Sequence, residues 1–120
     1  MKKIVTIIIL CLGCIGILGA QNNMFYDEAS DLYYEITDYN TVKVTYFDIE
    51  YHYYSGDVEI PSSVEYQGQI YTVTAIDDNA FAGCANLTSV HIPNTVTTIG
   101  EKAFGFSGLV SIVLPNSVRS

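Results

Sequence analysis

The C-terminal half of the chain contains two tandem copies of one short pattern, and this repetition constrains the fold more than any other feature. The first copy begins at Val73, the second begins at Val96, and residues 118–120 begin a third. The period is about 23 and then about 22 residues, a size at which each repeat forms one supersecondary unit. Such a unit cannot bury its own apolar face, so neighbouring units stack on one another. The sequence therefore predicts a solenoid, and solenoids usually serve as binding surfaces.

The apolar positions of the two copies correspond one to one. They are the pairs Ile76/Ile99, Ala80/Ala103, Phe81/Phe104, Leu87/Leu109, Val90/Ile112, Ile92/Leu114, Pro93/Pro115 and Val96/Val118. The Ala-Phe pair of each copy suggests a short helical turn that presents the phenylalanine inward. The strand that follows ends at a proline, which cannot donate to a ladder. These features predict an α+β repeat solenoid, a right-handed stack on a parallel sheet.

Alternation along the predicted strands separates core residues from exposed ones. Val90 and Ile92 point to the core, so the residues between them point outward. The outward positions are the candidate ligand-facing residues, namely Glu59 on the first strand, Ser89 and His91 on the second, and Ser111 and Val113 on the third.

The N-terminus has the layout of a secretory signal peptide. Lys2 and Lys3 precede an apolar run over residues 4–18, and Gly19-Ala20 supplies small residues before a polar segment. We expect residues 1–20 to be removed, which makes the protein secreted or exposed at the cell surface. The alternative is an uncleaved anchor, because about 20 apolar residues span a bilayer. Membrane contact is expected only through this segment, if it is retained.

Residues 21–72 differ in composition from the repeats. All ten tyrosines of the chain lie between Tyr26 and Tyr71. Strands are expected at 32–36 and 41–45, the first solenoid strand at 58–64, and a hairpin around residues 67–69. We interpret 21–72 as a β-rich cap that covers the open end of the stack. An aromatic platform for a ligand is the alternative. Repeat 1 then spans 73–95, repeat 2 spans 96–117, and 118–120 begin a truncated third repeat.

Composition excludes several classes of function. The chain has 13 acidic residues against 5 lysines and arginines and a net charge of −8, so it cannot neutralise a run of phosphates. Nucleic-acid binding is therefore excluded. Cys84 is the only cysteine beyond the signal segment, which rules out a disulfide framework. We expect it to fill the core rather than to act as a reactive thiol.

The sequence offers little for an enzyme. His52 and His91 are the only histidines, and neither lies beside a nucleophile motif. The acidic triplet at 77–79 lacks the spaced oxygen ligands of a calcium loop and is better explained as a helix cap. We assign no catalytic, cofactor-binding or metal-binding residue.

The first repeat, Ile76-Asp-Asp-Asn-Ala-Phe-Ala-Gly-Cys-Ala-Asn-Leu-Thr-Ser-Val-His-Ile-Pro-Asn-Thr-Val96, resembles the BspA-like leucine-rich repeat family. That family is common in exported proteins of Bacteroidetes and some protozoa. Asp77 stands where the motif usually has glycine, which returns as Gly100. The resemblance covers residues 54–118. It implies a curved leucine-rich repeat solenoid outside the cell, with roles in adhesion to host matrix proteins or other cells and no catalytic residues.

Two functions remain open. The first is an exported, non-enzymatic protein that mediates adhesion or recognition, with surface proteins or glycans of a host or neighbouring cell as partners. The second is a structural N-terminal fragment of a longer repeat array with no ligand site of its own. The core residues of the last repeat, Leu109, Ile112, Leu114 and Val118, are expected to be open on one side. Self-association through that C-terminal face would cover them.

Overall fold

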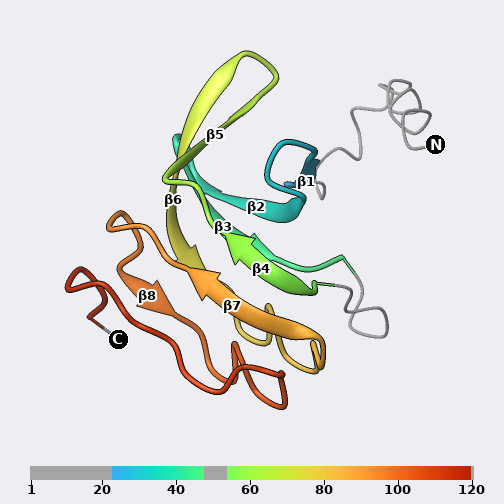
Figure 1. The fold of residues 1–120 in the computed structure, drawn as a ribbon. Coiled ribbons are helices and arrows are strands. Elements are labelled where there is room, and N and C mark those ends of the chain that lie inside the picture. The colour runs from blue at the N-terminus through green and yellow to red at the C-terminus, as the bar shows by residue number, and fades with distance from the viewer. Residues whose placement is uncertain (1–22, 48–53, 120) are drawn as a thin grey trace.

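The computed structural model describes residues 23–47 and 54–119, and the predicted signal peptide lies outside them. In this part of the chain the structure consists of strands and turns, with no helix. The elements in order are β1 (Met24–Asp27), β2 (Leu32–Asp38), β3 (Thr41–Thr45), β4 (Gly56–Glu59), β5 (Ser63–Tyr66), β6 (Gln69–Ile76), β7 (Leu87–His91) and β8 (Thr98–Ile99) (Figure 1). No helix in this described part is long and apolar enough to cross a membrane.

The larger sheet begins with the N-terminal strands. β1, β2 and β3 pair antiparallel, and β3 pairs with β6 in parallel. β5 and β6 form an antiparallel hairpin whose two-residue turn places both Gln67 (φ 53°) and Gly68 (φ 81°) in the left-handed region. Two successive positive φ values are the signature of a type I′ turn, which matches the twist of the strands it joins. The predicted strands at 32–36 and 41–45 and the predicted hairpin are confirmed.

This sheet continues from the cap into the repeats. Beyond the hairpin, β6 pairs in parallel with β8, through Ala75 opposite Thr98 and Ile76 opposite Ile99. The Thr97 N–H donates to the Thr74 carbonyl at 2.9 Å, and the Arg119 N–H donates to the Thr97 carbonyl at 2.8 Å. Cap and repeats thus share one continuous ladder on this side of the molecule.

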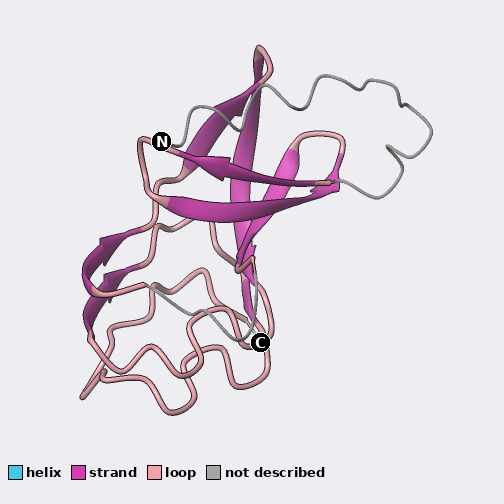
Figure 2. Cartoon of the chain, turned by 90° about the vertical axis from the view of Figure 1, so that its right-hand side faces the viewer, coloured by secondary structure: helices cyan, strands magenta, loops and turns pink. Residues whose placement is uncertain are grey.

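The opposite side carries a two-stranded parallel sheet, β4–β7, that packs as a separate layer (Figure 2). Val58 lies opposite Val90, and both side chains are buried. The first solenoid strand, predicted over 58–64, is confirmed only at Val58 and Glu59, which pair with the strand of repeat 1. Ser63 and Val64 belong instead to β5, which pairs with β6. β7 ends at His91, two residues before Pro93.

The predicted helical turn is wrong. Residues 78–83 and 101–106 form successive turns instead, and Asn79 (φ 62°) and Lys102 (φ 57°) are in the left-handed conformation. A left-handed residue interrupts the run of right-handed φ values that an α-helix needs. The turns of the two repeats bond to each other, since the Phe81 N–H donates to the Ala103 carbonyl at 2.7 Å. The described structure is therefore an all-β repeat stack rather than an α+β one.

The strand predicted for repeat 2 does not form a ladder. Residues 110–114 have no strand assignment, and no backbone hydrogen bond joins them to β7 within the described residues. The two repeats do approach closely just before this point. The Gly108 N–H donates to the Cys84 carbonyl at 3.0 Å, and a β-carbon on Gly108 would lie 2.3 Å from the Ala85 carbonyl oxygen. The two repeats are bonded again at Ser117, whose hydroxyl donates to the Val96 carbonyl at 2.7 Å.

The core runs as one cluster through cap and repeats. The inward phenylalanines are stacked: the rings of Phe81 and Phe104 lie 5.3 Å apart, and the Tyr54 ring contacts Phe81 in a tilted arrangement at 5.0 Å. Cys84 is buried in the same cluster, and burial raises the pKa of its thiol despite a backbone hydrogen bond from Tyr54 that opposes the shift. Cys84 thus fills the core, as expected.

The tyrosine-rich region also forms core. Phe25 stacks on Tyr66 with ring centroids 4.0 Å apart and on Tyr34 at 5.5 Å. Tyr34 and Tyr71 are buried, whereas Tyr39 is exposed. The buried rings of Tyr34 and Tyr71 are thus not available to a ligand, whereas Tyr26 and Tyr39 are exposed.

Candidate functional site

The outward face of β4 and β7 carries polar side chains in register. Asp57 lies opposite Ser89, and Glu59 lies opposite His91. Their exposure follows the predicted alternation, with Val58 and Val90 buried between them. Three of the sequence-predicted site residues, Glu59, Ser89 and His91, therefore lie together on one face.

Asp57 contacts both Ser89 and His91 on this face, although it is not among the predicted ligand-facing residues. The Ser89 hydroxyl donates to the Asp57 carboxylate. The Nε2 atom of His91 lies 3.2 Å from Oδ1 of the same carboxylate. Alternation could have identified Asp57, because it precedes Glu59 by two positions on the same strand.

A serine, a histidine and an aspartate meet here, but the arrangement is not that of a hydrolase. In a catalytic triad the imidazole bonds the serine hydroxyl and removes its proton, and the carboxylate orients the imidazole. Here the Ser89 hydroxyl donates to the carboxylate and the His91 ring lies 3.2 Å from the same carboxylate, so the geometry places no base on the hydroxyl. The network holds two strands together at the surface and does not activate a nucleophile.

A hollow of about 400 Å³ adjoins β7 and reaches repeat 2. Its lining residues are Ser89, Val90, His91, Ile92, Ser111, Ile112, Val113 and Pro115. Four of the five predicted ligand-facing residues thus surround one concavity: Ser89, His91, Ser111 and Val113. Ser111 and Val113 lie there even though the segment that carries them is not a strand.

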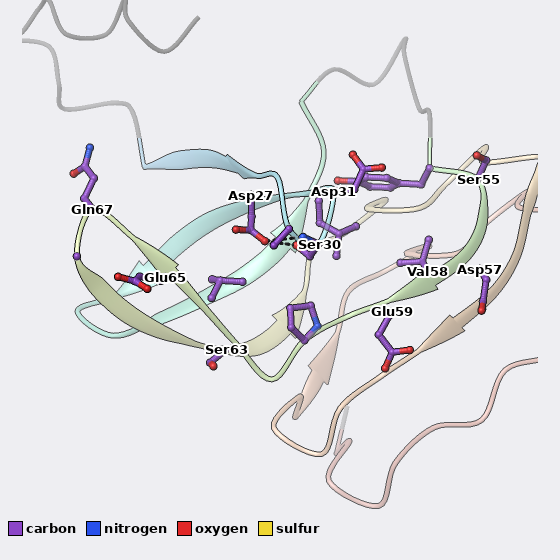
Figure 3. Close-up of a pocket in the computed structure, with 16 residues that line it drawn as sticks. Asp27, Ser30, Asp31, Ser55, Asp57, Val58, Glu59, Ser63, Glu65 and Gln67 are labelled. Carbon is purple, nitrogen blue, oxygen red and sulfur yellow. Dashed lines mark hydrogen bonds between the residues drawn. The ribbon is translucent and has the colours of Figure 1, made fainter. Parts of the chain in front are cut away.

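Glu59 borders a second, larger cavity of about 900 Å³ on the other side of β4. This cavity lies between β4, the β1–β2 turn and the β5–β6 hairpin (Figure 3). Its lining includes five carboxylates, from Asp27, Asp31, Asp57, Glu59 and Glu65. The predicted set is therefore divided between two concavities, one lined by β4 and the other by its partner strand β7.

Some of the cavity carboxylates are already engaged. Asp27 accepts hydrogen bonds from the Ser30 backbone N–H at 2.9 Å and from the Ser30 hydroxyl at 2.7 Å. Asp31 accepts one from the Tyr26 hydroxyl, and this bond raises the pKa of Tyr26 to about 12, with burial and the Asp31 charge adding to the shift. Among the described residues, no group of three histidine, cysteine, aspartate or glutamate side chains is placed to hold a metal ion.

Asp77, the departure from the repeat motif, joins repeat 1 to the cap. Its Oδ2 accepts the Thr45 hydroxyl at 2.9 Å, and its Oδ1 lies 3.1 Å from the Lys43 ammonium, which also pairs with Glu35 at 3.4 Å. Burial lowers the pKa of Lys43, but the hydrogen bonds and charges of Asp77 and Glu35 outweigh it and raise the pKa overall. The carboxylate bridges the two parts of the chain, which a glycine could not do.

The chain is similar to solved structures of leucine-rich repeat proteins. A leucine-rich repeat protein from Bacteroides ovatus is 32% identical with a TM-score of 0.59, over 82% of this chain and 24% of that one. One from Bacteroides capillosus is 26% identical with a TM-score of 0.65, over 81% and 69%. A leucine rich cell surface protein from Faecalibacterium prausnitzii is 29% identical with a TM-score of 0.60, over 78% and 24%.

The chain spans about a quarter of the length of two of these proteins. Among proteins with curated descriptions, none matches it. The family profile described as "BspA type Leucine rich repeat region (6 copies)" matches residues 57–120, more than half of the chain. The chain therefore belongs to the BspA-type leucine-rich repeat family.

Proposed function

We propose that this protein is exported and acts without catalysis, mediating adhesion to, or recognition of, surface proteins or glycans of other cells. The observation that carries the proposal is the convergence of Ser89, His91, Ser111 and Val113 around one hollow. Concave, partly apolar surfaces with a few polar groups are the usual form of binding sites. Within the described residues, the one serine–histidine–aspartate cluster lacks the geometry of a nucleophile.

The surface location is supported by the sequence and by one relative. Residues 1–20 have the layout of a signal peptide. The similar protein from F. prausnitzii is described as a cell surface protein. N-terminal sequencing of the protein recovered from intact cells tests export, and a mature chain that begins at Gln21 is the expected result. A chain that retains Met1 and stays inside the cell would contradict it.

A matched pair of variants tests recognition. Val113 lines the hollow and is 87% exposed, whereas Val110 is 97% exposed and lies outside the lining. The wild-type protein and the variants Val113→Asp and Val110→Asp are applied to immobilised extracellular matrix proteins and glycans. We expect Val113→Asp to weaken binding at least tenfold, as loss of a central contact does, while Val110→Asp binds as wild type. Equal loss in both variants, or in neither, would contradict a site at the hollow.

The second candidate is a structural segment of a longer repeat array. Its support is the apolar surface of repeat 2, where Phe106 is 93% exposed and Leu114 is 49% exposed. Exposed apolar clusters mark surfaces that another structure covers, and a further repeat or a second copy would do so. Light scattering over a range of protein concentrations tests self-association through this face. A monomer that fails to bind any immobilised ligand would favour the structural role over recognition.

A further inference from the structure

β5 has one backbone edge without a partner strand. It is the last strand of its sheet and pairs with β6 alone. The Val73 N–H donates to the Ser62 carbonyl at 2.9 Å, and hydrogen-bonded pairs recur at every second residue of antiparallel strands. The N–H and carbonyl groups of Ser63 and Glu65 therefore point away from β6. Within the described residues, no backbone hydrogen bond joins this side of β5 to another strand.

The 900 Å³ cavity lies along this edge. Ser63, Val64 and Glu65 all line it, whereas no residue of β6 does. Because side chains alternate between the two faces of a strand, a cavity that touches three successive residues adjoins the edge rather than one face. Figure 3 shows Ser63 and Glu65 on one side of the cavity, with Asp31 and Glu59 on other sides. Open space therefore borders the unpaired groups.

β1 approaches β5 without pairing with it. The Phe25 ring stacks on the Tyr66 ring with centroids 4.0 Å apart. In the part of the chain that the structure describes, however, β1 pairs with β2 and makes no backbone hydrogen bond to β5. An unpaired strand edge is a template for another strand.

The charge of the cavity lining is negative. The lining includes five carboxylates and no lysine, arginine or histidine. Asp27, Asp31 and Asp57 contact serine, tyrosine or histidine side chains, whereas the side chains of Glu59 and Glu65 have no hydrogen bond or ion pair within the described residues. A second copy of this chain would bring its own Glu65 to the edge, and like charges repel. A cationic segment is the occupant that fits.

We propose that the edge of β5 binds an extended polypeptide segment rich in lysine or arginine, which adds as a strand inside the cavity. Its backbone bonds the free N–H and carbonyl groups of Ser63 and Glu65, and its cationic side chains lie near Glu65 and Glu59. In this mode main-chain bonds give affinity and alternate side chains give specificity. This surface is separate from the hollow beside β7, so the proposal goes beyond the proposed function.

Hydrogen exchange of the full chain, followed by nuclear magnetic resonance with a synthetic peptide, tests the proposal. The probe is the acetylated and amidated hexapeptide Lys-Val-Lys-Val-Lys-Val. At about ten times its Kd, we expect it to slow exchange of the Ser63 and Glu65 amides about tenfold. The matched peptide Glu-Val-Glu-Val-Glu-Val, and lysine peptides N-methylated at alternate residues in either register, should give no protection.

Variants of the protein separate backbone pairing from charge. Ser63→Pro removes an outward N–H but no bond to β6, a place where edge strands accept proline, and it should abolish protection of the Glu65 amide. Circular dichroism melting checks that this variant folds. Glu65→Gln and Glu59→Gln should each weaken the lysine peptide about 2- to 5-fold, the effect of one exposed charge pair. Glu101→Gln is the control, because Glu101 is exposed on a turn of repeat 2 outside the cavity lining.

Four results would overturn the proposal. The Ser63 and Glu65 amides could be protected without peptide, and protection that grows with protein concentration would identify a second copy as the occupant. The N-methylated peptides could bind as well as the parent, which would exclude backbone pairing. The glutamate peptide could protect the same amides, which would exclude the charge argument. The lysine peptide could leave these amides unprotected at millimolar concentration. In each case the Val113→Asp test at the hollow decides the proposed function separately.

Discussion

The rings of Phe81 and Phe104 stack with their centroids 5.3 Å apart and their planes 6° from parallel. The two residues hold the same position in successive repeats, so the stack repeats with the sequence period. Tyr54, from the segment before β4, also contacts the Phe81 ring, with centroids 5.0 Å apart. The aromatic row thus joins the cap and both repeats into one core, on which the outward strand face is built.

Removal of the central ring should destabilise the protein most. Phe81→Ala deletes a fully buried side chain with aromatic neighbours on both sides, and we expect a loss of about 3–5 kcal/mol in the free energy of unfolding. Phe106→Ala is the matched control, because Phe106 is exposed and its loss should change stability by about 0.5 kcal/mol or less. Urea unfolding followed by circular dichroism measures both. Equal effects would show that the aromatic row is not part of the core.

The hydroxyl of Tyr54 connects two cap strands. It donates to the Thr45 carbonyl at 2.8 Å and accepts the Tyr33 N–H at 2.9 Å. Tyr54→Phe leaves both backbone groups without this partner, and the expected cost is about 1–3 kcal/mol. Tyr39→Phe should be neutral in the same urea experiment, since Tyr39 is 79% exposed. A neutral Tyr54→Phe would mean that water replaces the hydroxyl without cost.

Gly100 should not tolerate a side chain. A β-carbon there would lie 2.3 Å from Oδ1 of Asp78, which accepts the Glu101 N–H at 2.7 Å. We expect Gly100→Ala to cost about 1–3 kcal/mol, because the contact between repeats must open. At Gly105 the nearest atom would be 3.4 Å away, so Gly105→Ala serves as the control with a smaller loss. Comparable losses at the two glycines in thermal unfolding would contradict the close approach.

Stability should fall as the pH rises above about 10. Burial raises the pKa of Tyr34 and of Tyr54, so the folded state keeps these hydroxyls neutral. The unfolded chain ionises its tyrosines near pH 10, so the stabilisation is complete below that pH and is lost above it. The pKa of Lys43 is also raised in the folded state. Deprotonation of Lys43 at high pH removes its ion pair with Asp77, so it also lowers the stability as the pH rises.

Urea midpoints between pH 8 and pH 11, together with tyrosinate absorbance, check this pH dependence. The buried tyrosines should ionise only as the protein unfolds, and Tyr54→Phe should make the alkaline loss of stability shallower. Stability that stays constant through this range would show that the folded and unfolded chains bind the same number of protons.

The repeat pattern was sufficient to predict the parts of the fold that recur. The inward phenylalanines, the β4–β7 pairing and the outward positions of Ser89 and His91 all follow from matching two copies and alternating along a strand. The hairpin can also be predicted from the sequence, because Gln67-Gly68 separates two segments rich in β-forming residues. The domain boundaries drawn from composition remain a prediction.

Other features depend on contacts that a single sequence does not reveal. The polar residues before each Ala-Phe pair resemble a helix cap and so predict helical turns, but Asn79 and Lys102 have left-handed φ values that an α-helix does not contain. β1 is short, and β8 has only two residues, so neither gives a periodic signal. The strand predicted at Ile112 is not formed, because no strand in the described chain makes backbone hydrogen bonds with it. Asp77 joins repeat 1 to the cap through Lys43 and Thr45, and the sequence does not show that these distant residues are its neighbours.

Hydrogen exchange of the unliganded full chain tests most directly whether a recognition surface lies open beside β7. Slow exchange is expected for the amides of Phe81, Gly83, Thr97 and Gly100, each of which bonds the adjacent repeat or strand. The amides of Val90 and Ile92 should exchange fast, because they face the hollow rather than a partner strand. Slow exchange at Val90 and Ile92 would mean that repeat 2 closes the edge, and the account of the surface would be wrong.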